Sequence, residues 1–168
     1  MCIRDSLHTV LDGVKLIQPD IYDDFRGTNF EAYNEVKYRD EMPFAPFVVD
    51  SISTSRKHTL RGIHGDNKTT KLVSCLYGTI HMVIINRDPD SKQYNNWFHF
   101  TLSDRNKYQL LIPPKFGNGH LVMSDSAVFS YKLSEYYDRE SQFTIKWNDP
   151  MHNFFWPIKN PILSERDA

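Results

Sequence analysis

The sequence predicts an all-β domain, an antiparallel sandwich or barrel with few short helices, and three observations lead to this prediction. Short runs rich in β-branched and aromatic residues recur along most of the chain. Turn-forming residues separate these runs, and helical periodicity of useful length is hard to find. The predicted strands are VKLIQ (14–18), FVVDSIS (47–53), TLRGIH (59–64), KLVSCLY (71–77), TIHMVIIN (79–86), WFHFTL (97–102), YQLLIP (108–113), GHLVMS (119–124) and AVFSYKLSEYY (127–137).

Most of these strands end at a residue or motif that favours a turn. A strand cannot continue through Gly, Pro and Asp clusters without losing ladder hydrogen bonds or packing. The turn signals are Gly78, RDPD at 87–90, Ser103-Asp104, Pro113-Pro114 and Ser124-Asp125-Ser126. The strand spacing is therefore short and regular, as in sandwiches and barrels.

The residue pattern of two predicted strands indicates which of their faces are covered. In 79–86, Ile80, Met82 and Ile84 form one face, and the other face is also largely apolar. We expect this strand to be covered on both sides, as in a sandwich that also dimerises. In 127–137, Tyr131 shares a face with core-type residues. Its phenol is either a core aromatic or a group at the mouth of a barrel.

Composition limits the class of protein. The chain has 168 residues, 40% of them apolar, which fits one folded domain over residues 1–168 with no linker. The formal charge is −1 with both signs interspersed, so we expect no nucleic-acid partner. No apolar stretch approaches the roughly 20 residues that span a bilayer, and the start of the chain lacks a signal-peptide pattern. With only Cys2 and Cys75, we expect no disulfide framework, and we expect a soluble protein of the reducing cytoplasm.

The segment TLRGIHGDNKTTKLVSC (59–75) holds the first site candidates. The guanidinium of Arg61 can bind a phosphate through two parallel hydrogen bonds. His64 and Lys71 lie where two adjacent strands would meet. A lone His at a strand end more often has a structural role, so from these three residues alone both a structural role and a functional site remain open. A metal site would need three or four converging donors, such as an H-x-H pair with a later Glu, and none is present. We therefore expect no metal.

The motifs together resemble the dTDP-4-dehydrorhamnose 3,5-epimerase family. The resemblance covers residues 14–168 and is carried by DFRGTNFEAYNE (24–35), RGIH, KLV, the G-N-G-H loop, the paired tyrosines at 136–137, WNDP and PILSERDA. It implies a cupin, or double-stranded β-helix jelly roll, without metal or cofactor. It also implies a homodimer with exchanged N-terminal strands, acting on nucleotide-linked 4-keto-6-deoxy sugars. Residues 1–10 match nothing in the family, and we expect a non-native or disordered start.

The resemblance also implies catalytic roles. His64 would be the general base, and Asp167 would fix its tautomer. Lys71 would stabilise an enolate oxygen, and Tyr131 would return a proton from the opposite face.

Further positions would bind the substrate. The resemblance assigns the diphosphate to Arg61 with Arg166 as a second cation, the nucleotide to Arg26 and Glu31 of a partner subunit, and base stacking to Tyr137. Other positions depart from the family: Asn118 replaces a second histidine, His120 fills a slot usually held by an aromatic, Gln142 replaces a Glu, and Asp50 alone remains of the polar nucleotide contacts.

Alternatives remain open at this point. The motifs RGIHGD and P-P-x-x-G-N-x-H are more similar to a branch that acts on GDP-linked 4-keto-heptoses, inverting C3 or both C3 and C5. A ketoisomerase on the same substrates is a further enzymatic alternative. A non-catalytic sugar-nucleotide-binding cupin is the alternative from a different class.

Overall fold

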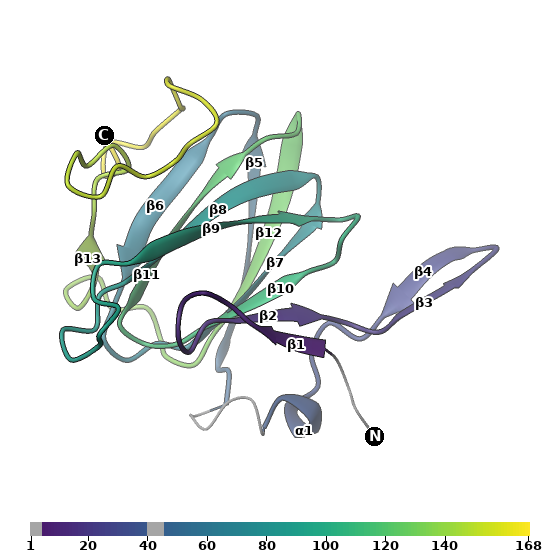
Figure 1. The fold of residues 1–168 in the computed structure, drawn as a ribbon. Coiled ribbons are helices and arrows are strands. Elements are labelled where there is room, and N and C mark those ends of the chain that lie inside the picture. Colours follow the sequence, from purple (N-terminus) through teal and green to yellow (C-terminus); the bar gives the residue numbers. More distant parts are fainter. Residues whose placement is uncertain (1–4, 40–45) are drawn as a thin grey trace.

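The computed structural model describes residues 5–39 and 46–168 and contains two facing antiparallel sheets (Figure 1). The six-stranded sheet has the order β1-β2-β10-β7-β12-β5, and the five-stranded sheet has the order β13-β6-β11-β8-β9. The strands of the six-stranded sheet are β1 (Asp5–His8), β2 (Lys15–Gln18), β5 (Val49–Arg56), β7 (Lys71–Tyr77), β10 (Gln109–Ile112) and β12 (Ser126–Leu133). Those of the five-stranded sheet are β6 (Leu60–Gly65), β8 (Thr79–Asn86), β9 (Trp97–Ser103), β11 (Phe116–Val122) and β13 (Phe143–Thr144).

The remaining elements lie outside the two sheets. Strands β3 (Ile21–Asp24) and β4 (Gly27–Phe30) form a hairpin that extends away from the sheets (Figure 1). The short helix α1 (Glu35–Tyr38) has Asn34 as its N-cap, whose side chain accepts hydrogen bonds from the amides of Val36 and Lys37. No helix among the described residues is long and apolar enough to cross a membrane.

A continuous apolar core fills the space between the sheets. Side chains from both sheets contribute to it, among them Val73, Leu110 and Phe129 on one side and Ile84 and Leu102 on the other. The alternation of apolar residues in these strands is what places one face of each sheet in this core. The all-β jelly-roll prediction is confirmed.

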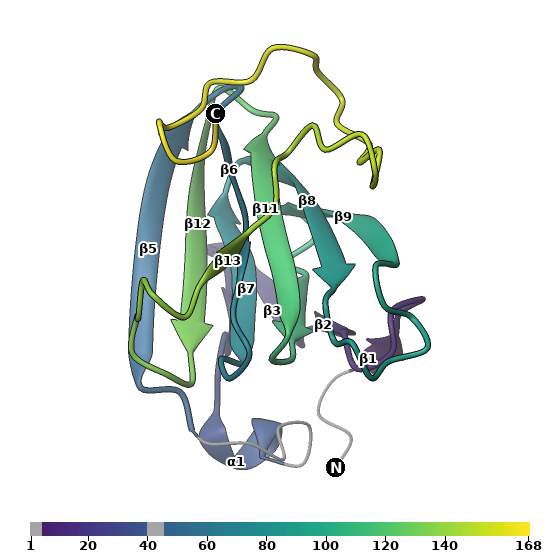
Figure 2. The ribbon, with the colours of Figure 1, turned by 90° about the vertical axis from the view of Figure 1, so that its left-hand side faces the viewer.

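The expectation that β8 is covered on both faces is also correct, but the cover comes from the same chain. Val83 and Ile85 point away from the central core and pack with Ile145 and Phe154 of the C-terminal segment. Figure 2 shows this segment, coloured yellow-green to yellow, crossing the outside of the five-stranded sheet. Burial of the outer face therefore requires no second subunit.

Several boundaries differ from the sequence prediction, among them the end of β5, which lies at Arg56 instead of residue 53. Strand β11 begins at Phe116, inside what looked like a Pro/Gly loop, and a Cβ at Gly117 or Gly119 would lie only 3.0 Å from Ile63. Strand β12 ends at Leu133, before the paired tyrosines. Within the expected non-native or disordered start, residues 1–4 lie outside the described residues, whereas Asp5–His8 pairs with β2.

Candidate active site

Strand β6 carries the first predicted site residues into the space between the sheets. Asn118 of β11 lies opposite His64 on one side, and Thr144 of β13 lies opposite His64 on the other. Gly62 has φ +108°, and a Cβ there would lie 2.6 Å from both the Asn118 oxygen and the Gly119 Cα. Only glycine allows this close approach of β6 to β11.

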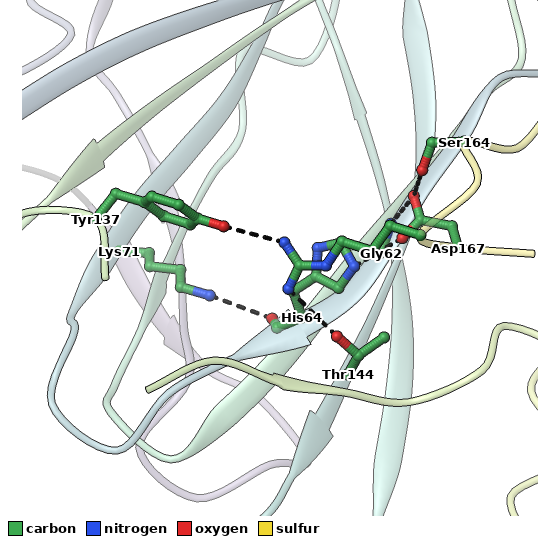
Figure 3. Close-up of polar contacts among 8 residues, drawn as sticks. Gly62, His64, Lys71, Tyr137, Thr144, Ser164 and Asp167 are labelled. Carbon is green, nitrogen blue, oxygen red and sulfur yellow. Dashed lines mark hydrogen bonds and ion pairs between the residues drawn. The ribbon is translucent and has the colours of Figure 1, made fainter. Parts of the chain in front are cut away.

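His64 and Asp167 form a hydrogen-bonded pair. The distance from His64 Nε2 to Asp167 Oδ1 is 2.7 Å, and the Asp167 side chain is only 5% exposed. Asp167 also accepts a hydrogen bond from Ser164 Oγ at 3.0 Å and a longer one from the Gly62 amide at 3.4 Å (Figure 3). A carboxylate only accepts, so it favours the tautomer that carries its proton on Nε2 and leaves Nδ1 as a free base.

The charge state of His64 follows from its surroundings. Burial lowers the pKa of His64 below its usual 6.5, and the Asp167 carboxylate opposes this effect without cancelling it. Arg166 and Lys71 lower the pKa further because they repel an imidazolium. The imidazole is thus neutral at pH 7, as a base must be before it accepts a proton.

Lys71 points into the same space from the first residue of β7. Its Nζ donates to Asn118 Oδ1 at 2.8 Å. It also donates to the His64 carbonyl at 3.3 Å (Figure 3). Burial lowers the pKa of Lys71 to about 8, although Asp66 counteracts part of this effect. At pH 7 the side chain is therefore still an ammonium ion, next to the His64 backbone.

A cavity of about 380 Å³ unites most of the predicted residues. Tyr131 lines it from β12, on the face that also carries Phe129 and Leu133, which places the phenol at the barrel interior. Ten of the thirteen predicted site residues contribute to the wall: Arg61, His64, Lys71, Asn118, His120, Tyr131, Tyr137, Gln142, Arg166 and Asp167.

The arginines of the cavity are held by neutral partners. Arg61 Nε donates to Ser55 Oγ at 3.0 Å. Arg166 donates to the Tyr137 hydroxyl and to Thr144 Oγ1, both at 3.2 Å (Figure 3). Neither contact neutralises a guanidinium, so both remain available to an anion.

His120 is buried beside Phe129, with ring centroids 4.3 Å apart. Its Nε2 has no hydrogen-bond partner among the described residues. Burial, with a smaller contribution from Arg61, lowers the pKa of His120 to about 3, so this imidazole is uncharged.

Three predicted residues do not line this cavity. Asp50 points to the outside of β5, where its carboxylate pairs with Lys132 at 2.6 Å. The inward positions of β5 are Ser51, Ser53 and Ser55, because side chains alternate along a strand.

Arg26 and Glu31 lie on or just after the projecting hairpin. Arg26 pairs with Asp24 at 2.6 Å, and Glu31 pairs with Lys37 at 2.8 Å. Within one subunit they are separate from the cavity.

Several cavity residues had not been identified from the sequence. Asp66 and Ser164 each lie two residues from a predicted site residue, so spacing along the chain was the signal that could have found them. Glu135 and Tyr136 also belong to the wall, next to Tyr137. No group of three or more His, Cys, Asp or Glu that could hold a metal ion occurs in the described part of the chain.

Comparison with known proteins places this geometry in a family. The family model described as dTDP-4-dehydrorhamnose 3,5-epimerase matches residues 8–168. The Escherichia coli K12 enzyme of that name is 36% identical over 166 residues, covering 96% of this chain and 90% of the relative. A Neisseria gonorrhoeae relative of the same name is 34% identical, and the chain spans 51% of its length.

Solved structures agree with the sequence relatives. The Legionella pneumophila epimerase in complex with dTDP-4-keto-L-rhamnose has a TM-score of 0.92 and 35% identity, covering 98% of this chain and 89% of the other. The Bacillus anthracis dTDP-4-dehydrorhamnose 3,5-epimerase with TDP and PPi bound has a TM-score of 0.93 and 32% identity, with coverage of 98% and 96%. With the fold, the matched residues and these relatives in agreement, the chain belongs to the dTDP-4-dehydrorhamnose 3,5-epimerase family.

Proposed function

We propose that this chain is an isomerase that inverts C3, C5 or both in a nucleotide-diphospho-4-keto-6-deoxy sugar, as relatives named dTDP-4-dehydrorhamnose 3,5-epimerase do. The observation that carries the proposal is the His64–Asp167 pair at 2.7 Å, in the wall of a cavity that Lys71 and Tyr131 also line. A base, a cation and a phenol around one cavity fit proton removal and return next to a ketone.

The reaction begins with proton removal. Nδ1 of His64 takes the proton from the carbon next to the C4 ketone, and the electron pair moves onto the C4 oxygen as an enolate. Asp167 stabilises the imidazolium that forms. The Lys71 ammonium faces the oxygen on which negative charge develops, so its stabilisation grows during the step.

Inversion requires a proton donor on the opposite face. Tyr131 supplies it, and solvent restores the phenol while His64 releases its proton. Reactant and product have the same composition, so the reaction consumes no oxidant or reductant. His64 and Tyr131 carry out the two proton transfers at carbon, and solvent returns both side chains to their starting forms.

The substrate's diphosphate would lie between Arg61 and Arg166, whose guanidinium groups are paired only with neutral partners among the described residues. Tyr137, which lines the cavity and is 63% exposed, would stack on the base.

The proposal includes a homodimer in which N-terminal strands are exchanged. Its support is the projecting β3–β4 hairpin, where Phe25 is 98% exposed and Tyr22 is 68% exposed. Large apolar side chains this exposed are typical of an interface. Exchange of this hairpin would carry Arg26 and Glu31 to the partner's nucleotide. A buried free thiol at Cys75 supports a reducing compartment such as the cytoplasm.

A GDP-linked 4-keto-heptose is the second candidate substrate. Its support is the sequence motif P-P-x-x-G-N-x-H, which contributes Asn118 and His120 to the cavity wall. The relatives described above all act on dTDP-linked sugars by name and do not support this candidate. The dTDP-linked hexose therefore comes first.

Deuterium exchange tests the proposal. The protein is incubated in D2O with dTDP- or GDP-linked 4-keto sugars, and deuterium at C3 and C5 is measured. An epimerase incorporates deuterium and inverts the centre, a ketoisomerase moves the carbonyl, and a non-catalytic binder does neither. His64→Ala should abolish exchange while a thermal shift with the nucleoside diphosphate persists. Exchange by that variant would refute the base assignment.

A further inference from the structure

Lys71 is a half-buried cation without an ionic partner among the described residues. Its two hydrogen bonds go to neutral acceptors, the His64 carbonyl and the Asn118 amide oxygen, and it forms no ion pair with any described residue. A buried ammonium surrounded only by neutral groups tends to lose its proton. A nearby negative charge that does not touch it would oppose this loss.

Asp66 is the carboxylate placed to supply that charge. It belongs to the turn that joins β6 to β7, it is 4% exposed, and it lines the same cavity as Lys71. One of its oxygens accepts hydrogen bonds from the backbone amides of Lys68 and Thr69 at 2.9 and 2.6 Å. Its own backbone carbonyl accepts from the Lys115 amide at 2.8 Å, which fixes the turn against the start of β11.

Gln142 completes the environment of Asp66. The short strand β13 pairs with β6 so that Phe143 lies opposite Gly65, and this register brings Gln142 beside Asp66. Gln142 Nε2 donates to the second Asp66 oxygen at 2.7 Å. An amide suits this position because a Glu would oppose one carboxylate with another, and one of the two would have to bind a proton. Gln142 thus supports Asp66 from the wall of the same cavity.

These contacts keep Asp66 ionised in spite of its burial. Burial alone would raise the pKa of Asp66, but the amides of Lys68 and Thr69 and the charge of Lys71 outweigh it and leave the pKa below its usual value. Asp66 is therefore a fixed negative charge in the cavity wall.

Other charged and titratable groups also face Lys71 across the cavity, from the elements packed around β7. They are Asp167, His64, His120, Tyr131, Glu135, Tyr136, Tyr137, Arg61 and Arg166. Of the carboxylates, Asp167 is engaged with His64 at 2.7 Å, and Asp66 is the one whose charge opposes the effect of burial on the Lys71 pKa.

We propose that Asp66, held in place by Gln142, is a positioning residue that keeps Lys71 in its ammonium form for the enolate step. The proposal rests on the proposed function, since it assumes that the Lys71 charge is needed for catalysis. It also reassigns Gln142 from substrate contact to support of a wall charge. Asp66→Asn removes the charge and retains the shape, and the Gln142 amide can turn to keep the hydrogen bond.

The first test measures Lys71 without substrate. The protein is labelled with lysine carrying ¹³C at Cε, the Lys71 signal is assigned with Lys71→Met, and its titration midpoint is compared between variants. Asp66→Asn should lower the midpoint by about 1 pH unit, since removing a nearby opposite charge disfavours the cation. The double variant Asp66→Asn/Gln142→Glu returns a carboxylate to the same pair and should move the midpoint back upward. Asp125→Asn is the matched control, because that side chain is 99% exposed at a distant turn.

The second test measures deuterium exchange against pH in the same proteins. The alkaline limb of Asp66→Asn should move to lower pH by the same amount, and the double variant should restore it. A Lys71 midpoint equal in the parent protein and Asp66→Asn overturns the proposal. The proposal is also overturned if Asp66→Asn lowers the Lys71 midpoint but leaves the alkaline limb of the exchange profile where it is in the parent protein. If Asp66→Asn does not fold, a double variant whose midpoint lies well below that of the parent overturns it as well. Absence of exchange in the parent protein refutes the proposed function, and the titration still decides whether Asp66 controls Lys71.

Discussion

Replacing Asp167 by Asn tests whether the His64–Asp167 pair performs the chemistry. The substitution keeps the shape of the side chain and removes its charge. Asp167 is buried, so water does not take the place of the lost carboxylate. The imidazolium that forms during proton removal then has a neutral partner at 2.7 Å in place of an anion. Burial already lowers the pKa of His64, and loss of the carboxylate lowers it further, which makes the imidazole a weaker base.

The size of the effect follows from this one contact. A hydrogen bond to a charged group contributes about 1.5–3 kcal/mol, compared with about 0.5–1.5 kcal/mol for a neutral one. The difference of roughly 1–2 kcal/mol corresponds to a rate loss of about 5- to 30-fold. The amide N–H can also donate to Nε2 and favour the tautomer with its proton on Nδ1, which would block the base. The expected loss is therefore at least about 10-fold, with ground-state binding unchanged.

The assay is the initial rate of deuterium incorporation from D2O into a 4-keto nucleotide sugar, with a thermal shift by the nucleoside diphosphate as the binding measurement. Ser164→Ala is the matched control, since it removes one donor to Asp167 Oδ2 and leaves the contact between Oδ1 and the imidazole. Its loss should be only a few-fold. A less than twofold loss in Asp167→Asn, with normal folding and binding, would refute the role of this pair.

Four further outcomes are expected. Tyr131→Phe should still exchange the proton removed by His64 but slow net inversion, as chiral analysis of the product would report; normal inversion would exclude Tyr131 as the acid. The pH profile of kcat/KM should be bell-shaped. Activity should fall below pH 6.5 because His64 becomes protonated, and it should fall near the Lys71 pKa of about 8 because the ammonium charge is lost. A profile that is flat from pH 5 to 10 would contradict both roles. Arg26→Ala should weaken nucleotide binding about tenfold in calorimetry if the hairpin reaches a partner subunit, and full affinity in a monomer by sedimentation would contradict this. Ile84→Ala should lower the free energy of unfolding by about 2–5 kcal/mol in urea, because Ile84 is fully buried in the main core; a loss below about 1 kcal/mol would show that this core collapses around the gap.

The sequence was informative where one physical pattern dominated. Strands such as β7 and β8 were predicted with their observed bounds, because continuous apolar residues between turn signals leave few alternatives. The hairpin β3–β4 was not predicted, since its residues are almost all exposed and no buried face imposes a period on them. The motif at 61–71 indicated Arg61, His64 and Lys71 because these residue types are not needed to join two strands.

The faces of polar strands could not be read from the sequence. In β5, the segment Asp50–Ser55 is polar at most positions, so either face could have pointed inward. Pairing with β12 decided it: Asp50 lies opposite Lys132 on the outer face, and the prediction that Asp50 faces the cavity does not hold within the subunit.

By itself, the sequence determined the class of fold, most of the strands and the residue types from which a proton-transfer site could be built. Only the tertiary structure decided which of them meet. Asp167 lies 103 residues from His64, and Gln142 lies 76 residues from Asp66. Local propensity carries no information over such separations. The contacts exist because the C-terminal segment folds back over the sheet to cover its outer apolar face, and in doing so it brings β13 and Asp167 to the edge of the cavity.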